Sequence, residues 1–408
     1  MRKIRTKLLT PLTPDQAAVH ADHVIAWDEA GISLIRPWNP NLDTDCEDRC
    51  DLLCLPGLID IHVHLSQYRI RGAYEPSLLS WLERHVFPEE ARSADPQYAR
   101  ALSDEFFRAL FTAGTTTSVI YTAPFHQACE IAFASAQAAG ARAFIGMTMM
   151  DRISPANLLQ TTDYAWSRSV ELYERWHCHS PLLDYIFTPR FALSCSAELM
   201  ALTATFIRDH GAWAQTHLSE NRAEIEEVLK LFDAGSYAQV YDRLGLLTPK
   251  TILAHAIHLA DEEMDILAAN NCKIAHCPDS NFFLKSGEFN YPALAAKGIE
   301  IGIGSDVAAG TTLNLLYHAK LANYRQSVHS LRPERLLYHL TLGNARLLGL
   351  GDRIGSLEPG KEADLCLLRP PHSIPDEDLL SALCFWGHEF PVVETVIAGR
   401  TVLSQLED

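Results

Sequence analysis

Residues 55–72 read LPGLIDIHVHLSQYRIRG, an apolar run that ends in two histidines one residue apart. His62 and His64 occupy alternate positions, and alternate residues of a β-strand face the same side. Both imidazoles therefore point in one direction, and Gln67 follows three residues later. We interpret the stretch as a buried strand whose end opens into a polar site.

Similar apolar stretches recur along the chain and alternate with longer helical patterns. The eight predicted strands are Gly57–His64, Thr115–Thr122, Ala141–Met150, Asp184–Phe191, Ala212–Glu220, Thr251–Leu259, Lys273–Asn281 and Ile299–Val307. The predicted helices include Gln97–Ala113, Phe125–Ala139, Ala197–His210, Asn221–Phe232 and Ala260–Asn270. Eight strand–helix units in succession predict an α/β fold, a closed parallel (β/α)8 barrel of the TIM type. An open doubly wound sheet is the alternative, but it calls for a glycine-rich phosphate loop that PGLIDIHVH does not contain.

The two ends of the chain depart from this alternation. Residues 1–56 consist of short strand-like pieces broken by Pro, Asn and Asp. VVETVIAGRTVLSQL at 392–406 reads as a strand, a glycine turn and a second strand, which is typical of a hairpin. We predict that residues 1–56 and 356–408 together form a small β-sandwich domain, with the barrel, residues 57–355, inserted between its two halves.

Charge and composition exclude several classes of function. The 408 residues include 51 acidic and 34 basic side chains, a formal net charge of −17. Such a chain repels nucleic-acid phosphates and acidic membrane surfaces. It contains no apolar stretch as long as a membrane span and no apolar signal segment, and its ten cysteines are scattered. We therefore expect a cytoplasmic protein with free thiols and without nucleic-acid or membrane partners.

Polar side chains gather where the predicted strands end, which is where the active site of such a barrel lies. These residues are His62 and His64 on the first strand, Arg190 and Phe191 on the fourth, His217 and Glu220 on the fifth, His255 and His258 on the sixth, and Asp306 on the eighth. The sequence leaves open which of His255 and His258 faces inward. Imidazoles and carboxylates that converge at one mouth predict a site for Zn²⁺ or a similar divalent ion.

The residue types favour a single metal ion. No lysine occurs between Lys7 and Lys230, so the end of the fourth strand offers Arg190 and no carboxylated lysine to bridge two metals. We expect one ion per chain, with His255 beside the bound water as a fifth contact and with four ligands, His62, His64, His217 and Asp306.

A divalent ion makes water available as a nucleophile near neutral pH, and hydrolysis then requires a residue that moves protons. Glu220, three residues past His217, is the candidate for this role, and His255 and Asp306 would orient the water and share its proton. The alternative for Glu220 is a carboxylate that only stabilises the start of the following helix.

Several motifs together resemble a known family. PGLIDIHVH, THLSE, HAIHL, HCPDSN and GSDVAAGTT resemble the amidohydrolase superfamily. HLSQ, TPRFA at 188–192, LLSWLERHVFP at 78–88, MMDR at 149–152 and SNFFLKSG at 280–287 resemble its guanine deaminase branch more closely. The resemblance extends from about residue 50 to residue 370, with the motifs in the family's order and spacing.

This resemblance implies a zinc aminohydrolase that converts guanine to xanthine and ammonia, usually as a homodimer. It implies a metal site of His62, His64, His217, His255 and Asp306, and catalytic roles for Glu220, His255 and Asp306. It implies that the purine contacts His64, Gln67, Arg190, Phe191, His217, Glu220 and Asp306. Ser66, Ser305 and Asp279 differ from the residues common in the family, and we expect Ser66 to affect the aim of Gln67 and Asp279 to add a carboxylate near the mouth.

The residue chemistry of the expected pocket suits a purine-like ring. Arg190 has fixed N–H donors for a carbonyl oxygen or ring nitrogen, Gln67 can donate and accept, and Phe191 can stack on the ring or present its backbone. Trp81 and Phe87 would close a lid or simply pack within a helix. Three alternatives stay open: a deaminase of 8-oxoguanine, a pterin or an adenine-type ring; a chlorotriazine hydrolase; and a barrel that binds metal without catalysis.

Overall fold

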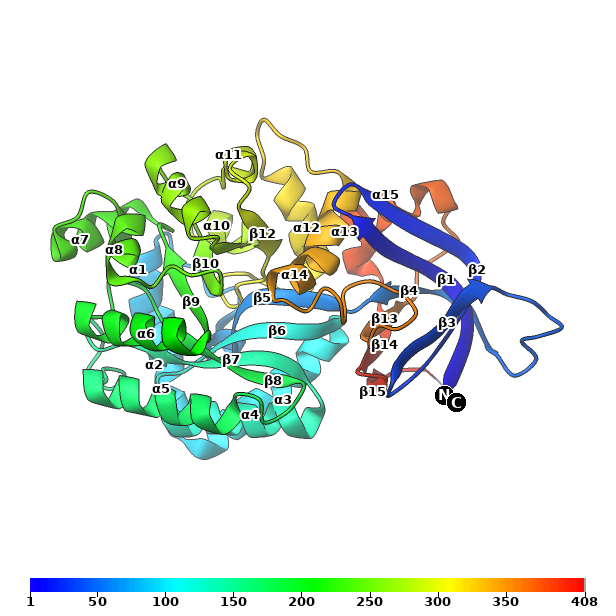
Figure 1. Cartoon of the computed structure of the whole chain (residues 1–408), viewed down its shortest axis with the longest axis horizontal. Helices are drawn as coiled ribbons and strands as arrows, with labels where there is room; N and C mark the ends of the chain where they lie inside the picture. The colour runs from blue at the N-terminus through cyan, green and yellow to red at the C-terminus, as the bar shows by residue number, and fades with distance from the viewer. Residues whose placement is uncertain (407–408) are drawn as a thin grey trace.

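The computed structural model describes residues 1–406, and two β-sheets organise them (Figure 1). In the larger sheet, eight parallel strands are paired in the order in which they follow along the chain. They are β5 (Leu58–His64), β6 (Thr115–Thr122), β7 (Arg142–Met149), β8 (Leu183–Pro189), β9 (Trp213–Leu218), β10 (Thr251–His255), β11 (Lys273–His276) and β12 (Glu300–Ile303). The predicted barrel is confirmed, and each of its strands begins within two residues of the predicted position.

The barrel closes where the segment after β12 returns to β5. The Asp306 amide donates to the His62 carbonyl oxygen at 2.8 Å, and the His64 amide donates to the Val307 carbonyl oxygen at 2.9 Å. The buried carboxylate of Asp60 accepts from the Ser305 amide at 2.9 Å. These bonds hold the segment that carries Asp306 directly against the strand that carries the two histidines.

Gly304 permits this close approach, because a Cβ atom there would lie 2.8 Å from the Cβ of His62 and 3.0 Å from its backbone nitrogen. We expect Gly304→Ala to lower the free energy of unfolding by about 1–3 kcal/mol, since overpacking forces rigid backbone apart. Urea denaturation measures the change. Gly235→Ala is the matched control, because the nearest atom to a Cβ there is the end of the Gln239 side chain at 3.5 Å. Equal stability of the two variants would contradict the expectation.

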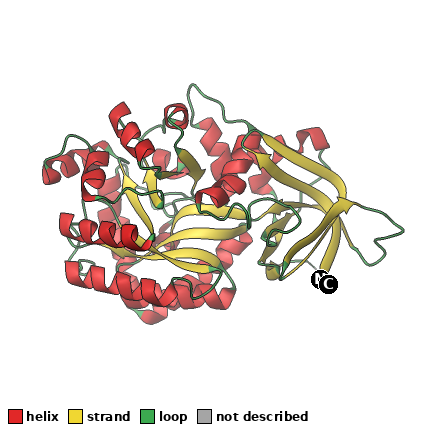
Figure 2. Cartoon of the chain, viewed as in Figure 1, coloured by secondary structure: helices red, strands yellow, loops and turns green. Residues whose placement is uncertain are grey.

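The helices lie outside the two sheets, and most of them pack around the barrel (Figure 2). They are α1 (Leu78–Trp81), α2 (Phe87–Ala91), α3 (Pro96–Thr112), α4 (His126–Ala139), α5 (Thr162–Trp176), α6 (Ala197–His210), α7 (Arg222–Phe232), α8 (Tyr237–Leu244), α9 (Asp261–Ala269), α10 (Pro278–Phe283), α11 (Tyr291–Ala296), α12 (Leu315–Tyr324), α13 (Pro333–Leu340), α14 (Leu342–Leu347) and α15 (Asp376–Trp386). Local capping explains why the predicted limits hold: the Ser196 hydroxyl accepts from the Leu199 amide at the start of α6, and Gly211 ends α6 in the left-handed conformation.

Several strands end earlier than the sequence predicts. β8 stops at Pro189, so Arg190 and Phe191 lie on the loop beyond it. β11 stops at His276, because Pro278 begins α10 where the prediction continued the strand to Asn281. The functional candidates on these segments consequently lie on loops that the strands position.

The smaller sheet is built from both chain ends, in the strand order β15-β14-β13-β4-β1-β2-β3. Its strands are β1 (Arg2–Thr13), β2 (Gln16–Asp28), β3 (Gly31–Pro37), β4 (Glu47–Pro56), β13 (Leu365–Leu368), β14 (Val392–Ile397) and β15 (Arg400–Ser404). It folds over a core of its own, formed by residues such as Leu8, Trp27, Leu52, Leu365 and Val396, which gives the β-sandwich of the predicted fold class. The hairpin of β14 and β15 is present as predicted.

One helix of the C-terminal segment joins the barrel side of the molecule. α15 packs against α12, so the segment after residue 356 contributes to both parts. Within residues 1–406, no helix is both long enough and apolar enough to cross a membrane.

Candidate active site

Four buried side chains at the mouth of the barrel could hold one metal ion. The donor atoms of His62, His64, His217 and Asp306 all lie within 4.8 Å of one another. Asp306 Oδ1 is 3.2 Å from His62 Nε2 and 3.1 Å from His64 Nε2. The two histidines end β5, His217 lies near the end of β9, and Asp306 follows β12. The predicted convergence of these strand ends therefore brings the four residues together.

Two of the histidines, His64 and His217, have properties that a bound cation requires. His217 Nδ1 donates to the carbonyl oxygen of Arg190 at 2.7 Å, which leaves Nε2 free to bind an ion. Burial lowers the pKa of His64 to about 4, and burial beside other histidines lowers the pKa of His217 well below its ordinary value. Three imidazoles and one carboxylate form a donor set that suits Zn²⁺, so these residues fit the expected ion.

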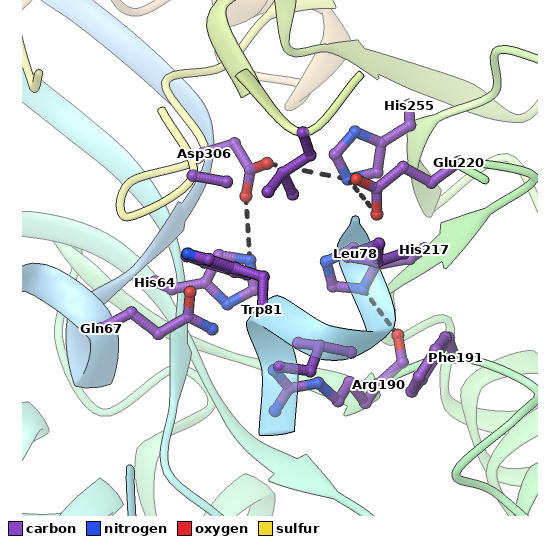
Figure 3. Close-up of a pocket in the computed structure, with 13 residues that line it drawn as sticks. His64, Gln67, Leu78, Trp81, Arg190, Phe191, His217, Glu220, His255 and Asp306 are labelled. Atoms are coloured by element: carbon purple, nitrogen blue, oxygen red, sulfur yellow. Dashed lines mark hydrogen bonds and ion pairs between the residues drawn. The ribbon is translucent and has the colours of Figure 1, made fainter. Parts of the chain in front are cut away.

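The structure resolves which histidine of HAIH faces the site. His255 Nε2 lies 3.5 Å from Glu220 Oε2 and 3.8 Å from Asp306 Oδ2, and His255 Nδ1 donates to Asn281 Oδ1 at 2.9 Å. His258 instead donates from Nε2 to the carbonyl oxygen of Ser286 at 2.8 Å. His255 is thus held with one ring nitrogen toward the two carboxylates (Figure 3).

Glu220 extends into the site and does not cap the following helix. Asn221 is the N-cap of α7, and the Glu224 carboxylate accepts from the amides of Glu220 and Asn221 at 3.2 Å each. The Glu220 side chain is left free to accept from the Ser286 hydroxyl at 3.2 Å. Burial, together with the nearby Asp306 carboxylate, raises the pKa of Glu220 to about 8. A carboxyl group with this pKa can both take up and release a proton near neutral pH.

The four-residue group borders a cavity at the mouth of the barrel. Its polar lining consists of His64, Gln67, Arg190, His217, Glu220, His255 and Asp306, and Phe191 also borders it, so the lining includes each predicted site residue except His62. Its apolar lining consists of Leu78, Trp81, Leu82, Leu284 and Ala309. Trp81 thus faces the cavity as one of the expected lid residues. Phe87 is absent from the lining, and its ring centre lies 5.5 Å from the Arg190 guanidinium carbon.

Sequence reasoning did not identify three residues that hold the site in shape. Asn281 contacts His255, and Ser286 contacts Glu220. Both lie in the SNFFLKSG motif, which indicated the family but did not indicate what these two residues do. Glu90 follows the FP of LLSWLERHVFP, and its buried carboxylate accepts from Gln67 and Arg190. Nothing in the local pattern distinguishes Glu90 from its neighbour Glu89.

The two residues expected to alter the pocket both make contacts that the sequence did not specify. Ser66 Oγ lies 3.4 Å from Glu90 Oε1, so it joins the group that holds Gln67. Asp279 Oδ2 accepts from the amide and the hydroxyl of Thr311, both at 2.7 Å. Asp279 is therefore used to fasten a loop, and it does not line the cavity.

Comparisons with known proteins agree with this geometry. The model of the amidohydrolase family matches residues 53–402. A guanine deaminase of Escherichia coli (strain K12) is 37% identical over 367 residues, which cover 86% of this chain and 83% of that protein. The solved structure of E. coli guanine deaminase has a TM-score of 0.93 at 32% identity and covers 100% of both chains. A solved guanine deaminase from C. acetobutylicum, with guanine bound in its active site, has a TM-score of 0.92 at 26% identity and covers 98% of this chain and 99% of that one.

Proposed function

The chain belongs to the amidohydrolase family, and on this premise we propose that it catalyses the hydrolytic deamination of guanine to xanthine and ammonia. The observation that carries the proposal is the composition of one cavity. The ion-binding group, a carboxyl group able to exchange protons, and two side chains suited to a purine edge all border the same space. Guanine is neutral at pH 7, so the acidic surface of the protein does not repel it.

We propose Zn²⁺ as the resident metal, one ion per chain, held by His62, His64, His217 and Asp306 with His255 close by. Three imidazole nitrogens and one carboxylate are typical of zinc sites. When bound, the ion would lower the pKa of a water molecule and so supply a nucleophile near neutral pH.

Side chains of the protein itself carry out the proton transfers. Glu220 takes a proton from the attacking water and delivers it to the ring nitrogen beside the reacting carbon. His255 and Asp306, whose facing atoms are 3.8 Å apart, orient the water and hold its second proton. A bond forms between the water oxygen and the reacting carbon. The second proton of the water passes to the exocyclic amino group, the carbon–nitrogen bond breaks, and the amino group leaves as ammonia.

The side chains that would recognise the ring lie in the part of the cavity away from Glu220 and His255. The Arg190 guanidinium donates to the carbonyl oxygen of the purine, and Gln67 pairs with a neighbouring edge atom. Phe191, at the loop after β8, borders the ring. His64, His217, Glu220 and Asp306 surround the carbon that is attacked.

A paired assay on one purified sample tests the function. We expect about one zinc per chain and the formation of equal amounts of xanthine and ammonia from guanine. Adenine, a pterin and 8-oxoguanine are assayed beside it, and adenine serves as the control because it offers Arg190 no carbonyl oxygen. Full zinc content without xanthine, together with turnover of another ring, would replace guanine as the substrate. Full zinc content without turnover of any ring would favour a non-catalytic metal-binding barrel.

We also propose that the protein acts in the cytoplasm as a homodimer with a small-molecule purine as its partner. The dimer is what the resemblance of the sequence motifs to guanine deaminases implies, and the ten free cysteines agree with this location.

A further inference from the structure

We propose that Glu90 is a positioning residue that sets the hydrogen-bonding polarity of the substrate pocket, and this inference rests on the proposed function. Glu90 lies in the short helix α2, and it does not line the cavity. It acts through Gln67 and Arg190, the two side chains that face the purine.

The contacts of Glu90 divide its carboxylate between these two residues. Oε1 accepts from Gln67 Nε2 at 3.0 Å, and Oε2 accepts from the Arg190 guanidinium at 2.7 Å. The side chain of Glu90 is 1% exposed and that of Arg190 is 4% exposed. A buried carboxylate is costly unless paired and hydrogen-bonded, and here both partners belong to the pocket wall.

The bond from Gln67 determines which end of its amide faces the substrate. A carboxylate can only accept, so the amide must turn its NH₂ group toward Glu90. The carbonyl oxygen Oε1 of Gln67 is then the end presented to the pocket. This assignment follows from the hydrogen-bond network, which is how the two ends of a glutamine amide are distinguished.

The bond from Arg190 fixes the plane of the guanidinium. One terminal nitrogen is held by Glu90, and the Phe87 ring lies 5.5 Å from the guanidinium carbon. Because Arg190 also lines the cavity, its guanidinium offers N–H donors there in a fixed plane. The pocket therefore presents one acceptor and a set of donors, and it selects rings that offer an N–H group together with a carbonyl oxygen. Figure 3 shows Gln67 and Arg190 away from Glu220 and His255, so this selection is separate from the proton transfers.

The test compares Glu90→Gln with Glu89→Gln. Glu89 is the neighbouring buried glutamate, and its partners are Arg92 and Tyr98, away from the cavity. We expect Glu90→Gln to raise KM for guanine by about 10–100-fold, the range for losing charge-assisted hydrogen bonds that hold substrate contacts. We expect kcat to change much less, because the contacts exist in both the ground state and the transition state. Zinc content should be unchanged. An unchanged KM in Glu90→Gln would overturn the proposal.

A double variant separates polarity from simple loss of packing. Gln67→Glu combined with Glu90→Gln exchanges the two groups, so that position 67 still presents an acceptor to the ring and position 90 still accepts from Arg190. We expect the exchange to recover most of the lost affinity for guanine. A KM as high as that of Glu90→Gln alone would overturn the assignment of polarity.

Crystal structures of the wild type and Glu90→Gln keep this test independent of turnover. The amide oxygen of Gln at position 90 can accept from only one of the two partners, so we expect the variant to displace the Gln67 amide or the Arg190 guanidinium from its position in the wild type. If both side chains stay in place, Glu90 does not position them. A wild-type enzyme that forms no xanthine would overturn the proposed function, and the two structures would still decide the role of Glu90.

Discussion

Glu220→Gln is expected to reduce kcat for guanine by about 10²–10⁴-fold, the range for removal of a general acid–base group. The amide has nearly the shape of the carboxyl group and can keep the contact with the Ser286 hydroxyl, which lies 3.2 Å from Glu220 Oε1. It cannot take a proton from water or deliver one to the ring. Steady-state kinetics with guanine at pH 7 measures the loss.

Metal analysis of the same sample distinguishes this loss of chemistry from loss of the ion. Zinc content should match the wild type, because Glu220 is not in the group of His62, His64, His217 and Asp306. Glu224→Gln is the matched control, since Glu224 is a buried glutamate of the same segment that accepts from the backbone amides of Glu220 and Asn221 and does not line the cavity. The mechanism is wrong if Glu220→Gln keeps wild-type kcat with a full complement of zinc.

Asp306→Asn is expected to have an effect of similar size through a different cause. Asp306 is the only anionic member of the four-residue group, and its Oδ1 lies within 3.2 Å of both His62 and His64. We expect zinc affinity to fall by more than about 100-fold, since losing a residue that merely orients a ligand already costs 10–100-fold. Zinc content after dialysis against a weak chelator measures this, and xanthine formation should be lost with the metal.

Asp279→Asn is the control for this second variant. Asp279 is another buried carboxylate at the same end of the barrel, and it accepts from the amide and hydroxyl of Thr311. The variant should retain zinc, because Asp279 contacts no ligand. If Asp306→Asn holds zinc as tightly as Asp279→Asn does, Asp306 is not a ligand.

The sequence predicted those parts of the site whose geometry follows from the periodicity of a strand and from the position of strand ends in a barrel. His62 and His64 share a face because a strand has a period of two, and the barrel rule places strand ends at one mouth. Helix limits at Ser196 and Gly211 followed from capping chemistry.

Residues whose roles depend on tertiary contacts could not be predicted in this way. Glu90 is separated by 100 positions from Arg190, and Ser286 by 66 positions from Glu220, so no local pattern links either pair. Asp279 shows the same limit: its charge predicted an additional carboxylate near the mouth, and only the structure shows that this carboxylate accepts from the amide and hydroxyl of Thr311 and does not line the cavity.

The closure of the barrel between β5 and the segment after β12, its seam, has a consequence for folding during synthesis. Asp60 and Ser305, which fasten the first and last strands together, are 245 positions apart. Three of the four proposed metal ligands, His62, His64 and Asp306, lie at this seam, so a nascent chain presents the two histidines long before Asp306 exists. The complete four-residue group therefore forms only after the last strand has docked, and metal binding to it would stabilise the closed barrel. Metal retention would then report complete folding, and chain fragments that end before β12 would lack Asp306.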